Sequence, residues 1–317
     1  MRREKKLITS HEPVLVQEVI KYFGLEYAHL KYRRPRVNKK FIDATVGTGG
    51  HSTQIIKAGG LVLGIDADAE MLAIARPNLE KACPIQHQKH GAGCFKLSRG
   101  NFRNLTRLAR KNGFEKVNGV LLDLGVSSIH YQKKSRGFSF DDLLAPLDMR
   151  VDRSSQKVKA SDLLNSLRRD QLRELFEKTL KKSEARRLSE LVILQRTGKE
   201  MKTVGDFLNA TSQVFIRQGK THPATRAFLA LRIAVNSELE NLKEVLPQAL
   251  AILVKNSRLI VISFHSGEDV IVKKFFKESE KQGVGKILTK NPVIASAEEI
   301  SRNQKARSAK LRVFQKV

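Results

Sequence analysis

Cysteine is scarce in this sequence, since Cys83 and Cys94 are the only two among 317 residues. Two thiols, without a secretory or membrane-spanning hydrophobic run, predict a protein of the reducing cytoplasm with no membrane partner. The C-x₁₀-C spacing, with His87 and His90 between, lacks the paired C-x₂-C knuckle that is usual in structural zinc sites. We therefore expect no metal centre in this stretch.

Acidic residues are outnumbered, because 32 Asp and Glu stand against 59 Lys and Arg, a formal net charge of +27. Such a positive field attracts polyanions, and cationic contacts to phosphates release condensed counterions. The imbalance favours a nucleic-acid partner over a small neutral substrate, although a basic host proteome would also produce it.

Two common nucleotide-site patterns are missing. There is no complete Walker-type G-x-x-x-x-G-K-[ST], which disfavours an NTPase, and no dinucleotide G-x-G-x-x-G. No internal repeat or long low-complexity segment occurs, which excludes solenoid and linker-rich architectures. Hydrophobic residues make up 41% of the chain and recur along its length, so we expect a packed core divided between two structural units.

Strands alternate with helices in the first part of the chain. Short apolar runs around Phe41–Val46 and in LVLGID, CFKLSR and VNGVLLD are each followed by a turn and a helical segment. This alternation predicts an α/β fold with a mostly parallel, doubly wound sheet and right-handed crossovers.

From about Asp141 to Gly219 the alternation stops and only helical periodicity is found. One stretch of helical spacing runs from Ser161, which resembles an N-cap, to Gly198, which resembles a helix stop. Strand character returns at SRLIVISFHS and at KLRVFQKV. We predict that residues 1–140 and 220–317 form one sheet domain, interrupted by an all-helical insert at 141–219.

The stretch DATVGTGGH, Asp43–His51, lies between a strand and a helix. Its glycines allow close approach of a ligand to the backbone, and the helix N-terminus offers free N–H donors. Asp66 ends the next strand, where an acidic residue in doubly wound folds accepts hydrogen bonds from ribose hydroxyls. A glycine turn or an aspartate alone is commonly structural. Together they indicate a site for an adenosyl group.

Three further features lie beside this crevice. Asp123 ends the fourth strand, in DLGVSS, where it either faces the ligand or caps a helix. Ser127 and Ser128 either cap a helix or contact substrate. Phe102 follows the third strand and either packs on adenine or belongs to the core.

Eight motifs in one order along the chain carry a family resemblance: HEPVL, TVGTGGHS, LLDLGVSS, RGFSF, PLDMRVD, HPATRAFLALRIAVNSEL, ISFHSGEDVIVK and ARSAKLRV. Together they resemble the RsmH (MraW) family of small-subunit ribosomal RNA cytosine-N4 methyltransferases. The resemblance implies a class I methyltransferase, Rossmann-like sheet split by a helical insert for substrate recognition. It also implies S-adenosyl-L-methionine as cofactor, with contacts at Gly49, Gly50, His51, Asp66, Phe102 and Asp123.

The implied substrate is one cytidine of 16S ribosomal RNA, at the decoding centre, in the assembled 30S particle of the cytoplasm. The sequence is compatible with a monomer or a homodimer. The chain departs from the family pattern in four places. His130 stands where Gln is usual at a cofactor contact, and no Gly-Glu-Glu segment is found near KTLKKSEARR. Gly267 replaces a leucine after ISFHS, and the loop Lys31–Lys40 looks like an addition.

Methyl transfer to an exocyclic amine needs positioning rather than a metal. We expect Asp123, or backbone carbonyls of Leu124–Ser127, to approach the amine, with His265 as a second polar group or proton acceptor. A structural role at the strand end is the alternative for His265.

Arg150 and Arg226 are candidate phosphate or base contacts, against the alternative of structural ion pairs with an acid such as Asp148. Two rival functions differ in class. One is methylation of DNA or of a small metabolite, which the missing D/N-P-P-Y tetrad and the charge disfavour. The other is a non-catalytic RNA-binding assembly factor that kept the cofactor fold.

Overall fold

The computed structural model describes residues 13–25, 39–84, 93–216 and 222–317. The chain divides into two compact units. The first comprises Met1–Gly125 and Leu242–Val317, and the second comprises Val126–Asn241. Each unit is described by itself.

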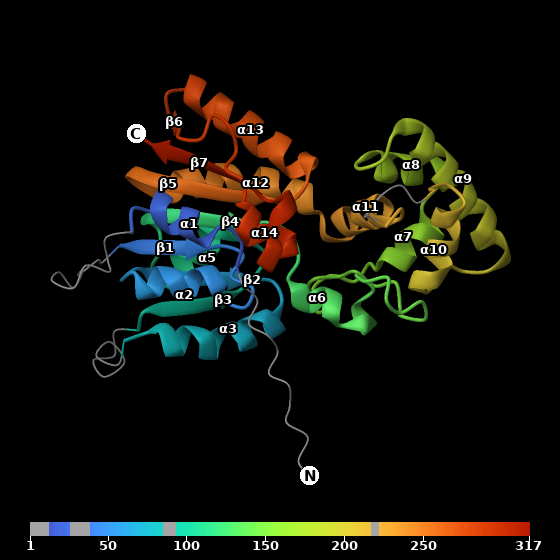
Figure 1. The fold of residues 1–317 in the computed structure, drawn as a ribbon, viewed down its shortest axis with the longest axis horizontal. Helices are drawn as coiled ribbons and strands as arrows, with labels where there is room; N and C mark the ends of the chain where they lie inside the picture. Colours follow the sequence, from blue (N-terminus) through green and yellow to red (C-terminus); the bar gives the residue numbers. More distant parts are fainter. Residues whose placement is uncertain (1–12, 26–38, 85–92, 217–221) are drawn as a thin grey trace, which may run out of the picture. The chain divides into compact units, whose positions relative to one another are not determined.

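A seven-stranded sheet with the order β3-β2-β1-β4-β5-β7-β6 forms the centre of the first unit (Figure 1). Its first five strands in spatial order are parallel, whereas β7 is antiparallel to both β5 and β6. This order, with its antiparallel β7, confirms the predicted class I methyltransferase sheet. The strand bounds are β1 Lys40–Asp43, β2 Leu61–Asp66, β3 Phe95–Arg99, β4 Val117–Asp123, β5 Leu253–Ser263, β6 Gly285–Ile287 and β7 Lys310–Lys316.

The central strands are apolar on both faces because helices cover both sides of a parallel sheet. Alternate residues of β4 and β5 enter two separate cores. One contains Val120 and Leu122, and the other contains Leu121. The helices of this unit are α1 Val16–Tyr22, α2 Gly50–Lys57, α3 Ala69–Ala82, α5 Leu105–Asn112, α12 Glu238–Ile252, α13 Ser266–Lys281 and α14 Ala297–Arg302, with the short 3₁₀ turns η2 Phe102–Asn104 and η4 Gln304–Ser308.

Helices build the second unit around one core of its own, which includes Phe176, Leu188 and Phe207. Within its described residues there is no strand, apart from an isolated bridge between Pro146 and Thr203. An all-helical insert is therefore confirmed. Its elements are α6 Ser128–Gln132, the 3₁₀ turn η3 Lys134–Arg136, α7 Ala160–Ser166, α8 Arg169–Glu177, α9 Lys182–Gly198, α10 Val204–Ser212 and α11 Thr225–Asn236.

The second unit is wider at both ends than the predicted range 141–219. Phe138, before that range, and Phe228 and Leu231 of α11, after it, lie in the same apolar core. Helical periodicity alone does not distinguish a helix of the insert from a helix that covers the sheet. The role of this unit in substrate recognition stays a prediction.

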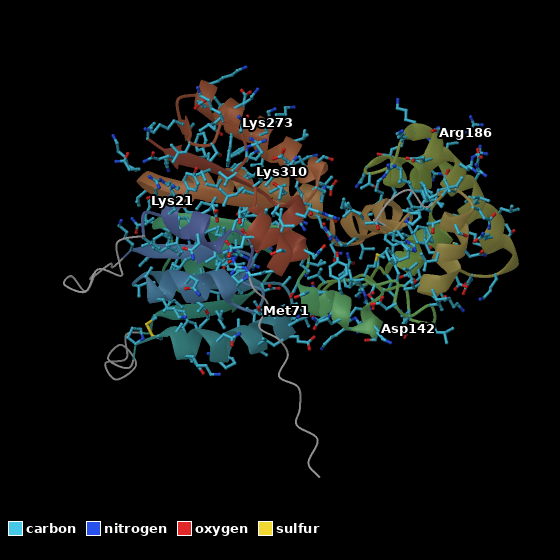
Figure 2. The ribbon with its side chains drawn as sticks, in the orientation of Figure 1. Lys21, Met71, Asp142, Arg186, Lys273 and Lys310 are labelled. Carbon is cyan, nitrogen blue, oxygen red and sulfur yellow. A yellow bond between two sulfur atoms is a disulfide. The ribbon has the colours of Figure 1, made fainter. Side chains whose placement is uncertain are left out.

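Cys83 and Cys94 form a disulfide with a Cα–Cα distance of 5.7 Å, which joins the end of α3 to the segment before β3 (Figure 2). The prediction of two free thiols is therefore wrong, and a reducing compartment no longer follows from these residues. His87 and His90 lie outside the described residues, as does nearly all of the loop Lys31–Lys40. Among the helices of the described ranges, none combines the length and the apolar content that a bilayer crossing requires.

Candidate active site

The glycine loop after β1 turns on a left-handed residue at its end. Gly49 has φ +88° and caps α2, and a Cβ atom there would lie 3.1 Å from Leu79 of α3. The side-chain amide of Asn78, also on α3, donates a hydrogen bond of 2.9 Å to the Thr48 carbonyl. Glycine is favoured because this positive φ strains other residues, and because Leu79 would have to shift slightly to admit a side chain. α3 therefore packs against the glycine loop and holds it in place.

Asp66, the last residue of β2, is bonded to the same loop. Its carboxylate accepts hydrogen bonds from the Gly47 N–H at 3.0 Å and from the Asp68 N–H at 2.8 Å. Burial raises the pKa of Asp66 to about 7, despite these two hydrogen bonds. A carboxylate of this kind gains from further hydrogen-bond donors, since they stabilise its charged form.

His51 and Asp123 lie at the carboxyl edge of the sheet, His51 on α2 and Asp123 at the end of β4. His51 Nε2 lies 2.8 Å from the Val14 carbonyl oxygen, and Nδ1 lies 3.5 Å from Asp123 Oδ2. The Asp123 N–H donates to the Thr45 hydroxyl at 2.7 Å. The other carboxylate oxygen, Oδ1, is buried and has no hydrogen-bond partner in the part of the chain that the structure describes. Burial raises the pKa of Asp123 to about 6.

Asp43 and Ser52 belong to the same cluster and were not predicted as site residues. The Ser52 hydroxyl donates a hydrogen bond of 2.7 Å to Asp43 Oδ2, and both residues are buried. Burial raises the pKa of Asp43. The sequence signal was present, because Asp43 ends β1 as Asp66 ends β2 and Asp123 ends β4. These strands are neighbours in the sheet, so the three acids share its carboxyl edge.

His265 follows β5 and caps α13, so it lies at the same edge of the sheet. Its Nε2 is 3.2 Å from Glu268 Oε1, while the other Glu268 oxygen accepts from the Phe264 N–H at 2.8 Å. This carboxylate fixes the strand-to-helix turn. Phe102 begins η2 after β3, is half-buried and packs against the core cluster that includes Leu105.

Ser127, Ser128 and His130 belong to the second unit, where they form the start of α6. The Ser127 hydroxyl accepts from the Ile129 N–H at 3.4 Å, and the Ser127 N–H donates to His130 Nδ1 at 3.1 Å. The capping interpretation of Ser127 therefore has direct support. His130 is buried, and its ring centroid lies 5.5 Å from that of Phe138.

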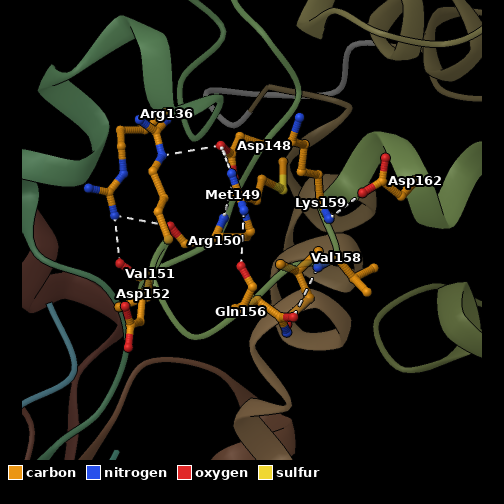
Figure 3. A network of polar contacts seen from close by, with 12 residues as sticks. Arg136, Asp148, Met149, Arg150, Val151, Asp152, Gln156, Val158, Lys159 and Asp162 are labelled. Carbon is orange, nitrogen blue, oxygen red and sulfur yellow. Dashed lines mark hydrogen bonds and ion pairs between the residues drawn. The ribbon is translucent and has the colours of Figure 1, made fainter. Parts of the chain in front are cut away.

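Arg150 and Arg226 are both in ion pairs within the second unit. Arg150 donates to the two Asp148 oxygens at 2.7 and 2.9 Å and to the Gln156 carbonyl at 3.0 Å (Figure 3). Although burial opposes it, the Arg150 hydrogen bonds hold the pKa of Asp148 below its usual range. Arg226 is paired with Glu184. Both arginines therefore form the structural ion pairs that were the alternative to RNA contacts, and their contacts to RNA stay predictions.

Known proteins are similar to this chain over nearly its whole length. The model of the MraW methylase family matches residues 8–317. Ribosomal RNA small subunit methyltransferase H of Pseudothermotoga lettingae is 39% identical over 313 residues, 96% of this chain and 98% of that protein. The protein of the same name from Chlamydia caviae is 40% identical over 313 residues, 96% of this chain and 97% of its own length.

Among solved structures, an rRNA methylase from Streptococcus thermophilus aligns with 88% of this chain and 87% of its own, at 11% identity and a TM-score of 0.39. That likeness is too distant to bear on the site. The family match and the two relatives cover nearly all of the chain. The chain therefore belongs to the MraW methylase family.

Proposed function

We propose that this chain transfers a methyl group from S-adenosylmethionine to the exocyclic N4 of one cytidine in small-subunit ribosomal RNA. The observation that carries the proposal is the family match over residues 8–317. The three carboxylates at one sheet edge beside a glycine loop support it, because this is where doubly wound folds bind their ligands. The decoding centre, the assembled 30S particle and a cytoplasmic location are further parts of the proposal.

The cofactor fits the residues at this edge. Asp66 would accept hydrogen bonds from the ribose hydroxyls, and the backbone at Gly49 and Gly50 allows close approach of the ligand. Phe102 would pack beside adenine, and His51 and Asp123 complete the proposed contacts at this edge. A cofactor contact from His130, a residue of the second unit, stays a prediction. The buried Asp66 carboxylate supports this fit, since it accepts two backbone hydrogen bonds and its charged form gains from further donors.

The bound cofactor supplies an electrophilic methyl group on a sulfonium. The chain contributes position and proton handling, which suits a weak nucleophile such as a cytosine amine. Asp123 would accept a hydrogen bond from that amine through Oδ1, which favours the geometry in which the nitrogen lone pair can react. His265, held by Glu268, is the second polar group at this edge.

The second unit would bind the RNA. The contacts that the sequence predicts for it are Ser127, Ser128, Arg150 and Arg226. Because carboxylates already pair both arginines, a groove on α8 and α9 is the better candidate for phosphates. Its volume is about 810 Å³, and its lining residues are Arg173, Glu177, Lys182, Ser183, Arg186, Arg187 and Glu190. Glu177 and Glu190 are paired with Arg173 and Arg186, and within the described residues Lys182 and Arg187 have no carboxylate in an ion pair with them.

Transfer of tritium from labelled S-adenosylmethionine tests the proposal. The purified protein is incubated with small ribosomal subunits that lack the modification, with free ribosomal RNA, with DNA and with no acceptor. We expect label on ribosomal RNA alone, at one cytidine when digested RNA is examined by mass spectrometry. Asp66→Ala is the control that should lose cofactor binding and transfer together.

Transfer of label to DNA would show that the protein methylates DNA and would contradict the proposal. Binding of subunits without any transfer, in a protein that binds the cofactor, would instead support an assembly factor.

A further inference from the structure

We infer that His51 and Asp123 form a proton-sharing pair, in which His51 holds one carboxylate oxygen and leaves the other to take a proton from the methylated amine. The inference rests on the proposed function for the identity of that amine. It makes His51 a positioning residue that acts through Asp123, in addition to its proposed place in the cofactor site.

One nitrogen of the His51 ring is fixed as a hydrogen-bond donor. Its Nε2 lies 2.8 Å from the Val14 carbonyl oxygen, which can only accept, so Nε2 carries a hydrogen. The next N–H, that of Leu15, donates at 2.7 Å to Glu299 of α14 and so holds this segment in place. His51 is buried, which leaves little freedom for the ring to turn. Nδ1 is therefore the ring nitrogen that faces Asp123.

The carboxylate faces Nδ1 with one oxygen only. Oδ2 lies 3.5 Å from His51 Nδ1, and Oδ1 is buried without a hydrogen-bond partner among the described residues. A bare ring nitrogen against an ionised oxygen would place two lone pairs face to face, so one proton is shared between the two groups. When that proton is on the ring, Asp123 is ionised and Oδ1 is free to accept.

Charged groups from four elements face Asp123, and they act in opposite directions. Asp43 of β1 and Glu268 of α13 raise the pKa of Asp123, as burial does more strongly. His51 of α2 and Lys305 of η4 lower it, and the His51 effect is the larger. His51 is therefore the main group that keeps this carboxylate charged near neutral pH.

The transfer step balances with these groups. The N4 lone pair forms the new N–C bond while the C–S bond breaks and its electron pair stays on sulfur. The amine then carries a positive charge and gives one proton to Asp123 Oδ1. That proton passes to solvent when the products leave, which restores the pair. No metal or redox partner takes part in this sequence.

His51→Gln separates the two roles of the ring. The glutamine amide can still donate to the Val14 carbonyl, but it has no basic nitrogen for Asp123. We expect the acid limb of the kcat–pH profile to move up by about one pH unit, because removing an opposite charge at this range raises a carboxyl pKa by about that much. At pH 6 kcat should fall about fivefold, since the pKa of Asp123 starts at about 6, and the loss should shrink as the pH rises to 9.

Lys57→Ala is the matched control, since it changes an exposed residue at the end of the same helix that is not one of the charged groups named above. It should leave the acid limb in place. An acid limb that stays in place in His51→Gln as well would overturn the inference, because a merely structural histidine would change rate without changing the profile.

The Asp123 side-chain ¹³C resonance gives a second measurement that needs no methyl transfer. The signal is assigned by its loss in Asp123→Asn, and it is followed against pH in the unaltered protein and in His51→Gln. We expect the carboxyl to titrate at higher pH in the variant. Equal titration in both would refute the pair even if the protein methylates RNA, whereas a shift in a protein that transfers nothing would refute only the proposed function.

Discussion

The raised pKa of Asp66 predicts how binding of the proposed cofactor should depend on pH. Its pKa is raised from the ordinary value of 3.8 to about 7, with burial as the main cause. The contribution of this group to the free energy of unfolding is therefore full below about pH 4 and is lost as the pH rises through 7 in the ligand-free protein. Two ribose hydroxyls would stabilise the ionised form, so binding and ionisation are linked.

We expect S-adenosylmethionine to bind more tightly as the pH rises from 6 to 8, with release of a proton at pH 6 and little release at pH 8. Calorimetric titration in buffers of different ionisation enthalpy measures both quantities. Asp66→Asn should bind weakly and lose most of this pH dependence. Proton uptake at pH 6 by the unaltered protein would show that the carboxyl is neutral in the complex and would contradict the assignment.

The sequence placed the separate acids at strand ends but not the contacts between them. Asp66 and Asp123 could be located because each ends a short apolar strand, which has a recognisable pattern. The contact from His51 to Val14 could not, since it joins α2 to a residue 37 positions away that lies just before α1. The disulfide was missed because neither cysteine spacing nor composition reports the distance between the ends of α3 and β3.

At the level of elements, the predicted strands of the parallel sheet are present, while the single helical stretch from Ser161 to Gly198 is three helices. α9 does end at Gly198, but α7 and α8 end without glycine or proline. Each break is fixed by the first turn of the helix that follows it. There, Gln171 and Glu184 accept hydrogen bonds from the N–H groups of Arg168 and Lys181. The N-caps are Arg and Lys, so the usual Ser or Thr signal is missing.

The cap of α10 is more conventional and predicts a measurable loss of stability. Asp206 accepts hydrogen bonds from the Thr203 N–H at 2.8 Å, from the Lys202 N–H at 3.0 Å and from Lys199 Nζ at 2.9 Å. Burial alone would raise the pKa of Asp206, but the hydrogen bonds from Lys199 and Thr203 lower it to about 2. Its stabilising effect is therefore present above about pH 4 and is lost as the pH falls toward 2.

Asp206→Asn should lower the free energy of unfolding by about 1 kcal/mol at pH 7, the usual worth of a capping side chain. The difference from the unaltered protein should shrink below pH 4. Urea unfolding followed by circular dichroism at pH 7 and pH 3 measures it. Glu200→Gln, which breaks only the exposed pair with Lys202, is the control and should change little. A difference independent of pH would mean that the carboxylate charge is not involved.

Over the whole molecule, the charge of +27 would attract RNA to any face, so net charge alone does not identify a binding surface. The groove on α8 and α9 differs from a general positive field because both of its acids are paired within it, whereas two of its cations have no ion pair in the part of the chain that the structure describes. Removing those two cations should therefore cost more RNA affinity than removing two cations elsewhere. The comparison requires variants of equal net charge.

Lys182→Ala combined with Arg187→Ala tests the groove against Lys277→Ala combined with Lys281→Ala, two exposed lysines of α13 in the first unit. The groove variant should weaken binding to small-subunit RNA and lower the slope of log K against log salt by about 0.7–0.9 for each lost phosphate contact. Titrations with fluorescent RNA from 50 to about 300 mM salt measure both quantities. Because both variants lose two charges, an equal loss in the two would assign the affinity to the overall field and not to the groove.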